Sequence, residues 1–250
     1  MINIYSHNVA LNGAFGITCM LREIKRTGHI DINVYTYYPD VFKNNPYVSN
    51  TEYARDWWPH LHIGEDSIEV NSSNILTDGH INITLCENIG IQCLDIHPEL
   101  YMGKDEVDDS ITSHGLPNEY ILIASEEPPI ANAIGDITSN VKYPVYYMLT
   151  KIAKVPGGIP IDHYNIRDLF SIVSKAKCIV TSRIDSIIHV ASALNVPTLV
   201  LLDNIVDARN YAYPCRQLIL VYNSIDKLNR NCLVSNMENV ISGARGIISL

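Results

Sequence analysis

Short apolar runs alternate with helix-like stretches along the chain, which has 250 residues. Residues 2–6 form a β-rich run, and in residues 14–27 the apolar positions recur at the spacing of one helix face. Gly28 is placed to end this helix, and a second β-rich run covers residues 32–38. A strand, a helix and a strand in this order predict a Rossmann-like unit, with a crevice at the loop after the first strand.

The second half of the chain starts the same alternation again. The patterns predict strands over residues 120–124, 144–149, 178–181, 198–202 and 218–222, and helices over residues 166–175, 186–194 and 236–248. We expect 218–222 to be the last strand and 236–248 a closing helix. Alternating strands and helices are typical of parallel α/β architecture, so we expect an α/β protein with two Rossmann-like domains facing a cleft.

Three segments of the first half fit this alternation less well. Residues 45–78 carry scattered polar residues and are predicted to be irregular. Residues 81–86 form a short apolar run that indicates a strand. The acidic stretch that follows Tyr101 is predicted to be a turn-rich linker that ends near Pro117.

The balance of charge changes near residue 118. Acidic residues outnumber basic ones by more than two to one up to that point, whereas the two kinds are nearly balanced in residues 119–250, and the whole chain has a net charge of -9. We therefore expect an N-terminal domain over 1–118 and a C-terminal domain over 119–250, with a last helix that can pack back on the first domain. The first domain repels polyanions, while the second can accept a phosphate locally.

The N-terminus, the apolar runs and the cysteines indicate where the protein is located and whether it binds a metal. Nothing at the N-terminus resembles a signal peptide, and the longest apolar runs are much shorter than a membrane span. We expect a cytoplasmic protein with no transmembrane segment. The six cysteines include no Cys-x-x-Cys pair, so buried free thiols are expected rather than a zinc cluster or a disulfide framework. No metal site is predicted.

Residues 176–198 carry the pattern that points most directly to chemistry. They predict a strand, a tight turn, a helix and a second strand entered through Pro197. Asp185 is placed to cap the helix, and the amides around Ile187 then point into the crevice, where a helix N-terminus can hold a diphosphate. His189 lies one turn further on the same side. Alternatively, Asp185 is only a cap and His189 is a buried histidine with a structural partner.

The same segment resembles the donor-binding motif of glycosyltransferase family 9, the heptosyltransferases that build bacterial lipopolysaccharide. That motif has a strand, then Asp-Ser/Thr-Gly-x-x-His-x-Ala-Ala-Ala, then a strand entered through proline. The matching positions here are Asp185, Ser186, His189, Ala191, Ala193 and Pro197. Weaker matches occur at residues 21–25, 44–48 and 232–240. The resemblance implies a GT-B fold, an inverting transfer, and a nucleotide-diphosphate-sugar donor as co-substrate with no other cofactor.

Two departures from the family motif bear on its chemistry. Ile187 stands where the family has a glycine that lets the donor approach the backbone, and its β-branched side chain would crowd a ligand there. The family also has an aspartate directly after a glycine in the first loop, where this chain has Asn12 and Gly13 on the acceptor side. A general base normally takes the proton of the acceptor hydroxyl, and His7 at the exit of the first strand is the candidate substitute. The other interpretation is that His7 is only a loop histidine.

The residue that would supply positive charge near the donor phosphates also differs from the one in the family. The family often has a lysine in the loop after the first strand of the second domain, where this chain has Ser125 followed by two glutamates. Arg183, two residues before Asp185, is the preferred replacement, with Lys151 and Lys154 as alternatives. The other interpretation is that Arg183 is only a solvated surface arginine.

The acceptor side carries Trp57 and Trp58, whose ring faces suit stacking on a sugar or a base, although a buried structural pair is the alternative. Two acceptor classes fit: an envelope saccharide, or a hydroxymethylated base of phage DNA. The acidic first domain argues against DNA, because proteins bind its phosphates through Lys and Arg. A second class of function is a catalytically inactive protein that binds a nucleotide or nucleotide-sugar, since the family aspartate and glycine are both missing.

Overall fold

A computed structural model gives the fold of the protein, and it describes residues 1–6, 9–28, 31–54, 67–71, 79–125, 141–148, 155–163, 165–182, 184–224, 228 and 230–250. The chain forms two compact units, Met1–Met102 and Gly103–Leu250. The break lies before the change in charge near residue 118, because α3 (Lys104–Ser113) packs on α5 (Ile166–Lys175) within the second unit.

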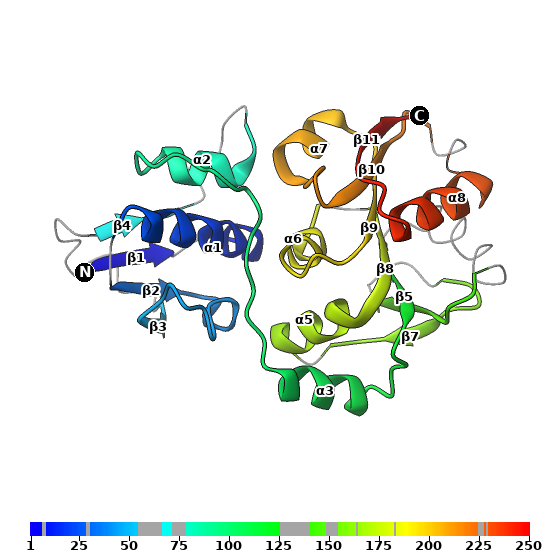
Figure 1. The fold of residues 1–250 in the computed structure, drawn as a ribbon, viewed down its shortest axis with the longest axis horizontal. Coiled ribbons are helices and arrows are strands. Elements are labelled where there is room, and N and C mark those ends of the chain that lie inside the picture. Colours follow the sequence, from blue (N-terminus) through cyan, green and yellow to red (C-terminus); the bar gives the residue numbers. More distant parts are fainter. Residues whose placement is uncertain are drawn as a thin grey trace. The chain divides into compact units, whose positions relative to one another are not determined.

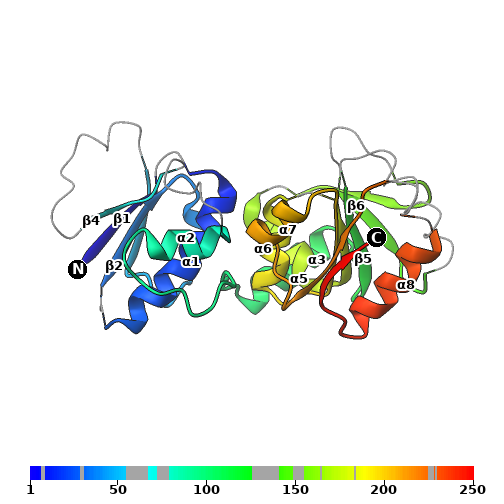
Figure 2. The same cartoon turned by 90° about the horizontal axis from the view of Figure 1, so that it is seen from above.

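The first unit contains a parallel sheet with the strand order β3-β2-β1-β4. Its elements are β1 (Ile2–Ser6), α1 (Leu11–Arg26), β2 (Ile32–Thr36), the 3-10 helix η1 (Pro39–Val41), β3 (Asn50–Tyr53), β4 (Ser67–Glu69) and α2 (Ile81–Glu87). Alternate residues of β1 and β2 point into a core that includes Ile4, Ile32 and Val34. α1 lies along one face of the sheet and packs on α2 (Figures 1 and 2). The predicted β-α-β start is confirmed, since β1 and β2 pair in parallel.

Two predictions for the first unit are wrong. Residues 81–87 form α2 rather than a strand, because His80 caps the segment: the Asn82 amide donates to His80 Nδ1 over 3.2 Å. Buried side chains occur on every side of this short run, so its pattern does not distinguish a helix from a strand. The segment predicted to be irregular contains β3 and β4, and β3 is mostly exposed because it is an edge strand with no apolar face to bury.

The second unit is built on a parallel sheet with the order β11-β10-β9-β8-β5-β6-β7. Its strands are β5 (Tyr120–Ala124), β6 (Val145–Met148), β7 (Ile159–Ile161), β8 (Ala176–Thr181), β9 (Thr198–Leu202), β10 (Gln217–Val221) and β11 (Gly246–Ser249), and its further helices are α6 (Ser186–Ala193), α7 (Ile205–Tyr211) and α8 (Arg230–Ile241). Helices cover both faces (Figure 1). Leu199 of β9 packs in a cluster with Leu233 of α8, while its neighbour Val200 packs with Ile188 of α6. The expected α/β class is therefore confirmed.

The predicted acidic linker is wrong, since it contains α3. The Gly103 amide donates to Glu106 Oε2 (3.4 Å) at the start of this helix. Side chains of α5 then bind it: Arg167 Nε lies 2.6 Å from Glu106 Oε1, and His114 Nε2 lies 2.8 Å from Asp168 Oδ2. Glu106, one of the acidic residues that suggested a linker, is thus a partner of α5.

The end of the chain also differs from the prediction. α8 ends at Ile241 rather than at residue 248, and β11 follows and pairs in parallel with β10. Gly243 and Gly246 adopt φ of 106° and 120°, values that other residues rarely reach, and so let the chain turn between helix and strand. α8 packs on β8, β9 and β10, so it belongs to the second unit.

Candidate functional site

The order of strands in the second sheet reverses between β5 and β8. The chain runs from β5 outward to β6 and β7, and then continues from β8 on the other side of β5. In open parallel sheets, ligands bind in the crevice outside the carboxyl ends of the strands at such a reversal. Ser125 follows β5 and Ser182 follows β8, and their Oγ atoms are 2.7 Å apart. The structure therefore brings the predicted Ser125 to the reversal point, together with Ser182, which the sequence did not single out.

The helix that starts beside this point is capped as predicted. Asp185 Oδ1 accepts a hydrogen bond from the Ile187 amide over 2.8 Å. Asp185 and Ser186 are half-buried, so their side chains are reachable from solvent. The Ile187 side chain is only 3% exposed and packs inward. The Ile187 amide, which was expected to face a ligand, donates its hydrogen to the Asp185 carboxylate.

His189 lies in the packed interior of the second unit. Its side chain is 0% exposed, and its Nδ1 is 2.7 Å from the hydroxyl of Tyr213. Gln217 holds this tyrosine, since its Oε1 accepts from the Tyr213 amide (3.0 Å) while its Nε2 donates to the Ile188 carbonyl (2.8 Å). The hydrogen bond to Tyr213 fits the structural interpretation of His189. No local motif predicts Tyr213, because it follows α7 and meets His189 only through packing.

The first unit has a similar reversal between β1 and β4. Asn12 and Gly13 lie in the first turn of α1, just beyond the carboxyl end of β1. Asn12 is half-buried and Gly13 is buried. The acceptor-side pair therefore lies at the position where a parallel sheet of this order binds ligands.

Several predicted residues lie outside the described part of the chain. These are His7, Trp57, Trp58, Lys151, Lys154 and Arg183.

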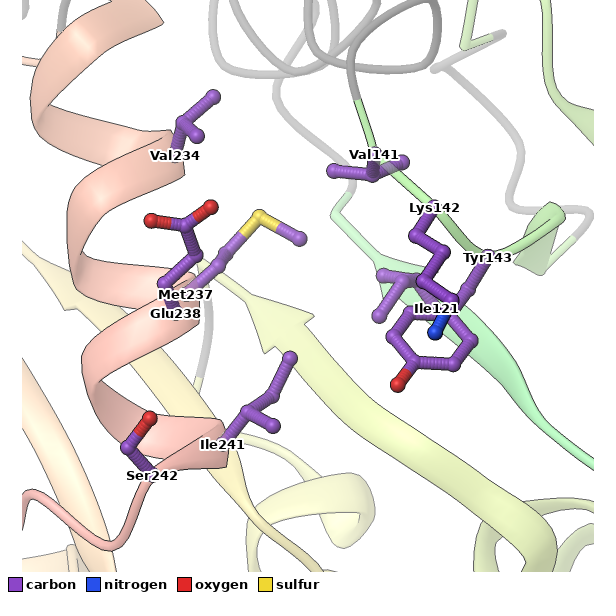
Figure 3. Close-up of a pocket in the computed structure, with 9 residues that line it drawn as sticks. All are labelled: Ile121, Val141, Lys142, Tyr143, Val234, Met237, Glu238, Ile241 and Ser242. Carbon is purple, nitrogen blue, oxygen red and sulfur yellow. The ribbon is translucent and has the colours of Figure 1, made fainter.

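A pocket of about 460 Å³ lies elsewhere in the second unit, between α8 and the segment that precedes β6 (Figure 3). It is lined by Ile121, Val141, Lys142, Tyr143, Val234, Met237, Glu238, Ile241 and Ser242. Ile121 is near the start of β5, whereas Ser125 follows the end of that strand. The pocket is therefore at the amino ends of the strands and is separate from the Ser125 site.

The chain matches no protein-family model and no curated protein sequence. Solved structures do resemble it. A glycosyl transferase of family 9 from Veillonella parvula has a TM-score of 0.67 at 13% identity, covering 97% of this chain and 97% of its own. The chain has the GT-B fold. E. coli ADP-heptose lipopolysaccharide heptosyltransferase II shares this GT-B fold, with a TM-score of 0.63 at 10% identity over 97% of this chain and 99% of its own.

A third GT-B structure is E. coli heptosyltransferase WaaC with ADP, with a TM-score of 0.62 at 9% identity over 98% of this chain and 99% of its own. The fold that the motif at Asp185 implied is thus confirmed. Among the described residues of this GT-B protein, no helix is both long and apolar enough to cross a membrane.

Proposed function

We propose that this chain is a glycosyltransferase that moves a sugar from a nucleotide-diphosphate-sugar to an acceptor hydroxyl, with inversion at the anomeric carbon. The observation that carries the proposal is the meeting of Ser125, Ser182 and the Asp185 cap at the carboxyl ends of β5 and β8. The fold that the chain shares with heptosyltransferases supports the same class of reaction.

The charges of the site suggest how it would hold the donor. The half-buried Ser186 hydroxyl can donate to phosphate oxygens, and the N-terminal end of α6 adds a small positive potential. Ser125 is only 3% exposed and is bonded to Ser182, so a donor would have to displace this bond to reach it. Asp185 carries a negative charge, so its partner on the donor is a sugar or ribose hydroxyl rather than a phosphate. Arg183 follows Ser182 in the sequence and is our candidate for neutralising the diphosphate. The nucleotide-sugar is a co-substrate, and we assign no other cofactor.

The acceptor would bind to the first unit, where Asn12 lies in the first turn of α1. Neither Asn12 nor Gly13 can take a proton at neutral pH, so we assign the role of general base to His7, with Trp57 and Trp58 stacking on the acceptor ring. We favour a saccharide acceptor over a hydroxymethylated base of phage DNA, because acidic residues dominate the first 118 residues. We place the reaction in the cytoplasm, or in the host cytoplasm if a phage encodes the chain.

Nucleotide release from a panel of ADP-, GDP-, UDP- and dTDP-sugars tests the proposal. One donor should be hydrolysed slowly without acceptor, and Asp185→Ala should reduce this rate about 10–100-fold, as expected when a hydrogen bond from a hydroxyl to a carboxylate is lost. Asp185→Asn keeps the cap but removes the charge, so it separates donor binding from helix capping.

Asn204→Ala is the matched control. Asn204 caps α7 after β9 just as Asp185 caps α6 after β8, with the Val206 amide donating to Asn204 Oδ1 over 2.8 Å. The control loses a cap of the same kind away from the strand reversal and should keep full activity. Equal loss in Asn204→Ala and Asp185→Ala would show that only helix stability was measured.

The alternative is an inactive protein that binds a nucleotide or nucleotide-sugar, which the missing carboxylate at the Asn12-Gly13 pair favours. Tight binding of a donor without turnover, also with saccharide acceptors supplied, would establish that alternative. A gel shift with hydroxymethylated and unmodified duplex DNA at two salt concentrations tests the DNA acceptor. Binding to neither duplex removes it.

A further inference from the structure

Three cysteine side chains of the first unit come together although they are far apart in the sequence. Cys19 lies on α1, Cys86 on α2 and Cys93 in the segment after α2, and their sulfur atoms all lie within 4.8 Å of one another. Cys19 and Cys86 are buried, and Cys93 is half-buried. The cluster arises from the packing of α1 on α2, so the sequence spacing that argued against a metal site could not indicate it.

We propose that Cys19, Cys86 and Cys93 bind a soft metal ion, for which Zn²⁺ is the appropriate probe. Thiolates are the ligands that such ions prefer. In a tetrahedral zinc site with Zn–S bonds of about 2.3 Å, two sulfurs are about 3.8 Å apart. The Sγ atoms of Cys19 and Cys93 are 3.7 Å apart already. Small side-chain rotations would bring the remaining pair distances, which are at most 4.8 Å, to this value.

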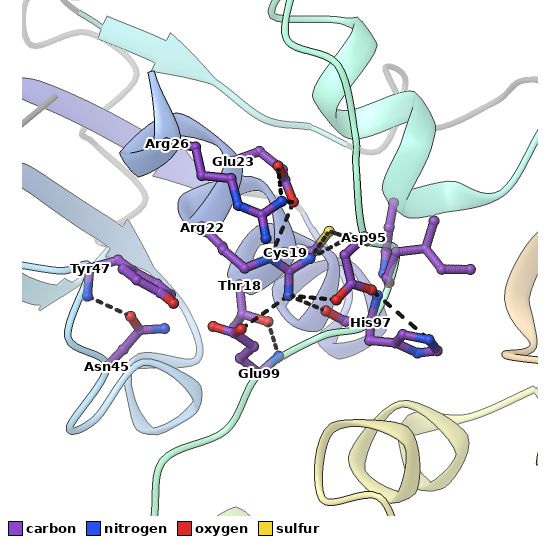
Figure 4. Close-up of polar contacts among 12 residues, drawn as sticks. Thr18, Cys19, Arg22, Glu23, Arg26, Asn45, Tyr47, Asp95, His97 and Glu99 are labelled. Atoms are coloured by element: carbon purple, nitrogen blue, oxygen red, sulfur yellow. Dashed lines mark hydrogen bonds and ion pairs between the residues drawn. The ribbon is translucent and has the colours of Figure 1, made fainter. Parts of the chain in front are cut away.

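A buried arginine contributes positive charge beside such a site, and it shares this charge with Glu23, whose Oε1 is 3.1 Å from Arg22 Nε, and with Glu99. Three thiolates around a divalent ion leave one net negative charge, and Arg22 Nη2 lies 3.5 Å from Cys19 Sγ. Arg22 Nη1 also donates to the carbonyl of His97 (3.0 Å) and to Glu99 Oε1 (3.1 Å), as Figure 4 shows. These bonds fix the segment that follows Cys93 against α1, so the ligands are held together before an ion arrives.

Metal binding would not leave the Asp95 carbonyl without a hydrogen bond. Cys19 Sγ donates to the Asp95 carbonyl over 2.8 Å. When the three sulfur–metal bonds form, the three thiol protons pass to solvent and this hydrogen bond is lost. Arg22 Nη2 still donates to the same carbonyl. Solvent reaches the cluster on the side of the half-buried Cys93, so a water molecule can complete a tetrahedral shell there.

Metal titration of the full chain tests the site. The protein is prepared under reducing conditions, freed of metal with a chelator, and titrated with Co²⁺ and then Zn²⁺. We expect one ion per chain, sulfur-to-cobalt charge-transfer bands that Zn²⁺ removes, and a higher melting temperature with Zn²⁺. Cys93→Ser should weaken Zn²⁺ binding by more than the about 100-fold that outer-shell changes cost.

Cys215→Ser is the control, because Cys215 is exposed and lies in the second unit. It should bind the metal as the wild type does. An absence of sulfur-to-cobalt bands in the wild type overturns the proposal even if Cys93→Ser fails to fold. Equal binding by Cys93→Ser also overturns it. A wild-type protein that forms a Cys19–Cys93 disulfide and binds no metal after reduction overturns it as well. None of these readouts depends on the proposed transferase activity.

Discussion

Gly16 allows α1 and α2 to pack closely, and its replacement by alanine tests this contact. A Cβ atom at position 16 would lie 2.5 Å from Leu85 Cδ1 and 2.7 Å from Asn82 Oδ1. Neither neighbour can move away freely. Leu85 is 2% exposed, and Asn82 Nδ2 is bonded to the Ile96 carbonyl over 2.6 Å. Gly16→Ala must therefore push the two helices apart.

Two opposing terms set the size of the effect. Overpacking a core costs about 1–3 kcal/mol. Alanine is favoured over glycine in a helix interior by about 1 kcal/mol, which offsets part of this cost. Because two contacts below 3 Å meet side chains that are held in place, we expect an overpacking cost in the upper part of this range, about 2–3 kcal/mol. The net destabilisation of the first unit is then about 1–2 kcal/mol, equivalent to an about 5–30-fold rise in the population of the open state.

Amide hydrogen exchange followed by mass spectrometry measures this change for each unit separately. Peptides from α1 and α2 should exchange about 5–30-fold faster in Gly16→Ala, while peptides from α6 in the second unit should not change. In a Leu85→Ala background the clash is partly relieved, so the same substitution should cost about 1 kcal/mol less. Protection of α1 and α2 that stays the same or increases in Gly16→Ala would refute the reasoning.

Three further changes test other parts of the structure. Asn165→Ala removes the cap of α5 and should lower the stability of the second unit by about 1 kcal/mol in thermal unfolding, while Asn165→Asp should not. Tyr213→Phe removes the hydroxyl that binds His189 and should cost about 1–3 kcal/mol in urea unfolding; no change would mean that the bond is unimportant. Burial raises the pKa of Cys178 to about 12, so iodoacetamide at pH 8 should modify the exposed Cys215 and leave Cys178 intact until the chain unfolds, as mass spectrometry can show.

The elements that the sequence predicted well are those whose side chains are buried on both faces, or on one clear apolar face. β5 and β9 are buried on both faces, so they appear as continuous apolar runs, and their predicted bounds agree with the structure. α5 has a capping Asn165 and one apolar face, and residues 166–175 were also predicted correctly. In these segments the local pattern and the tertiary environment favour the same structure.

The elements that were missed depend on contacts from far along the chain. α3 looks like an acidic linker until Arg167 of α5 is seen to bind Glu106. β11 becomes a strand only because β10 offers an edge to pair with. A local sequence pattern does not identify such partners, so the acidic first turn of α3 and the last apolar run did not lead to a prediction of these two elements.

The candidate site also contains one feature that the local sequence could predict and others that depend on tertiary contacts. The cap at Asp185 follows from residues within one turn, and the structure confirms it. The pairing of Ser125 with Ser182 depends on β8 lying beside β5, and the cluster around Cys19 depends on α1 lying beside α2. Strand order and helix packing are tertiary properties, so both groupings required coordinates.

The residues that give this chain its fold are not the residues that would perform the chemistry. The family's aspartate follows a glycine, so its position in the Asn12-Gly13 pair is Gly13, which has no side chain and fits into the first turn of α1. The Ile187 side chain is buried within the second unit, so α6 begins and is capped as usual. Neither residue disturbs the buried strands from which the likeness to heptosyltransferases arises, yet the first lacks a proton acceptor. Turnover of a bound donor by the wild-type chain, and its loss in Asp185→Ala, is therefore the observation that decides between a transferase and a binder.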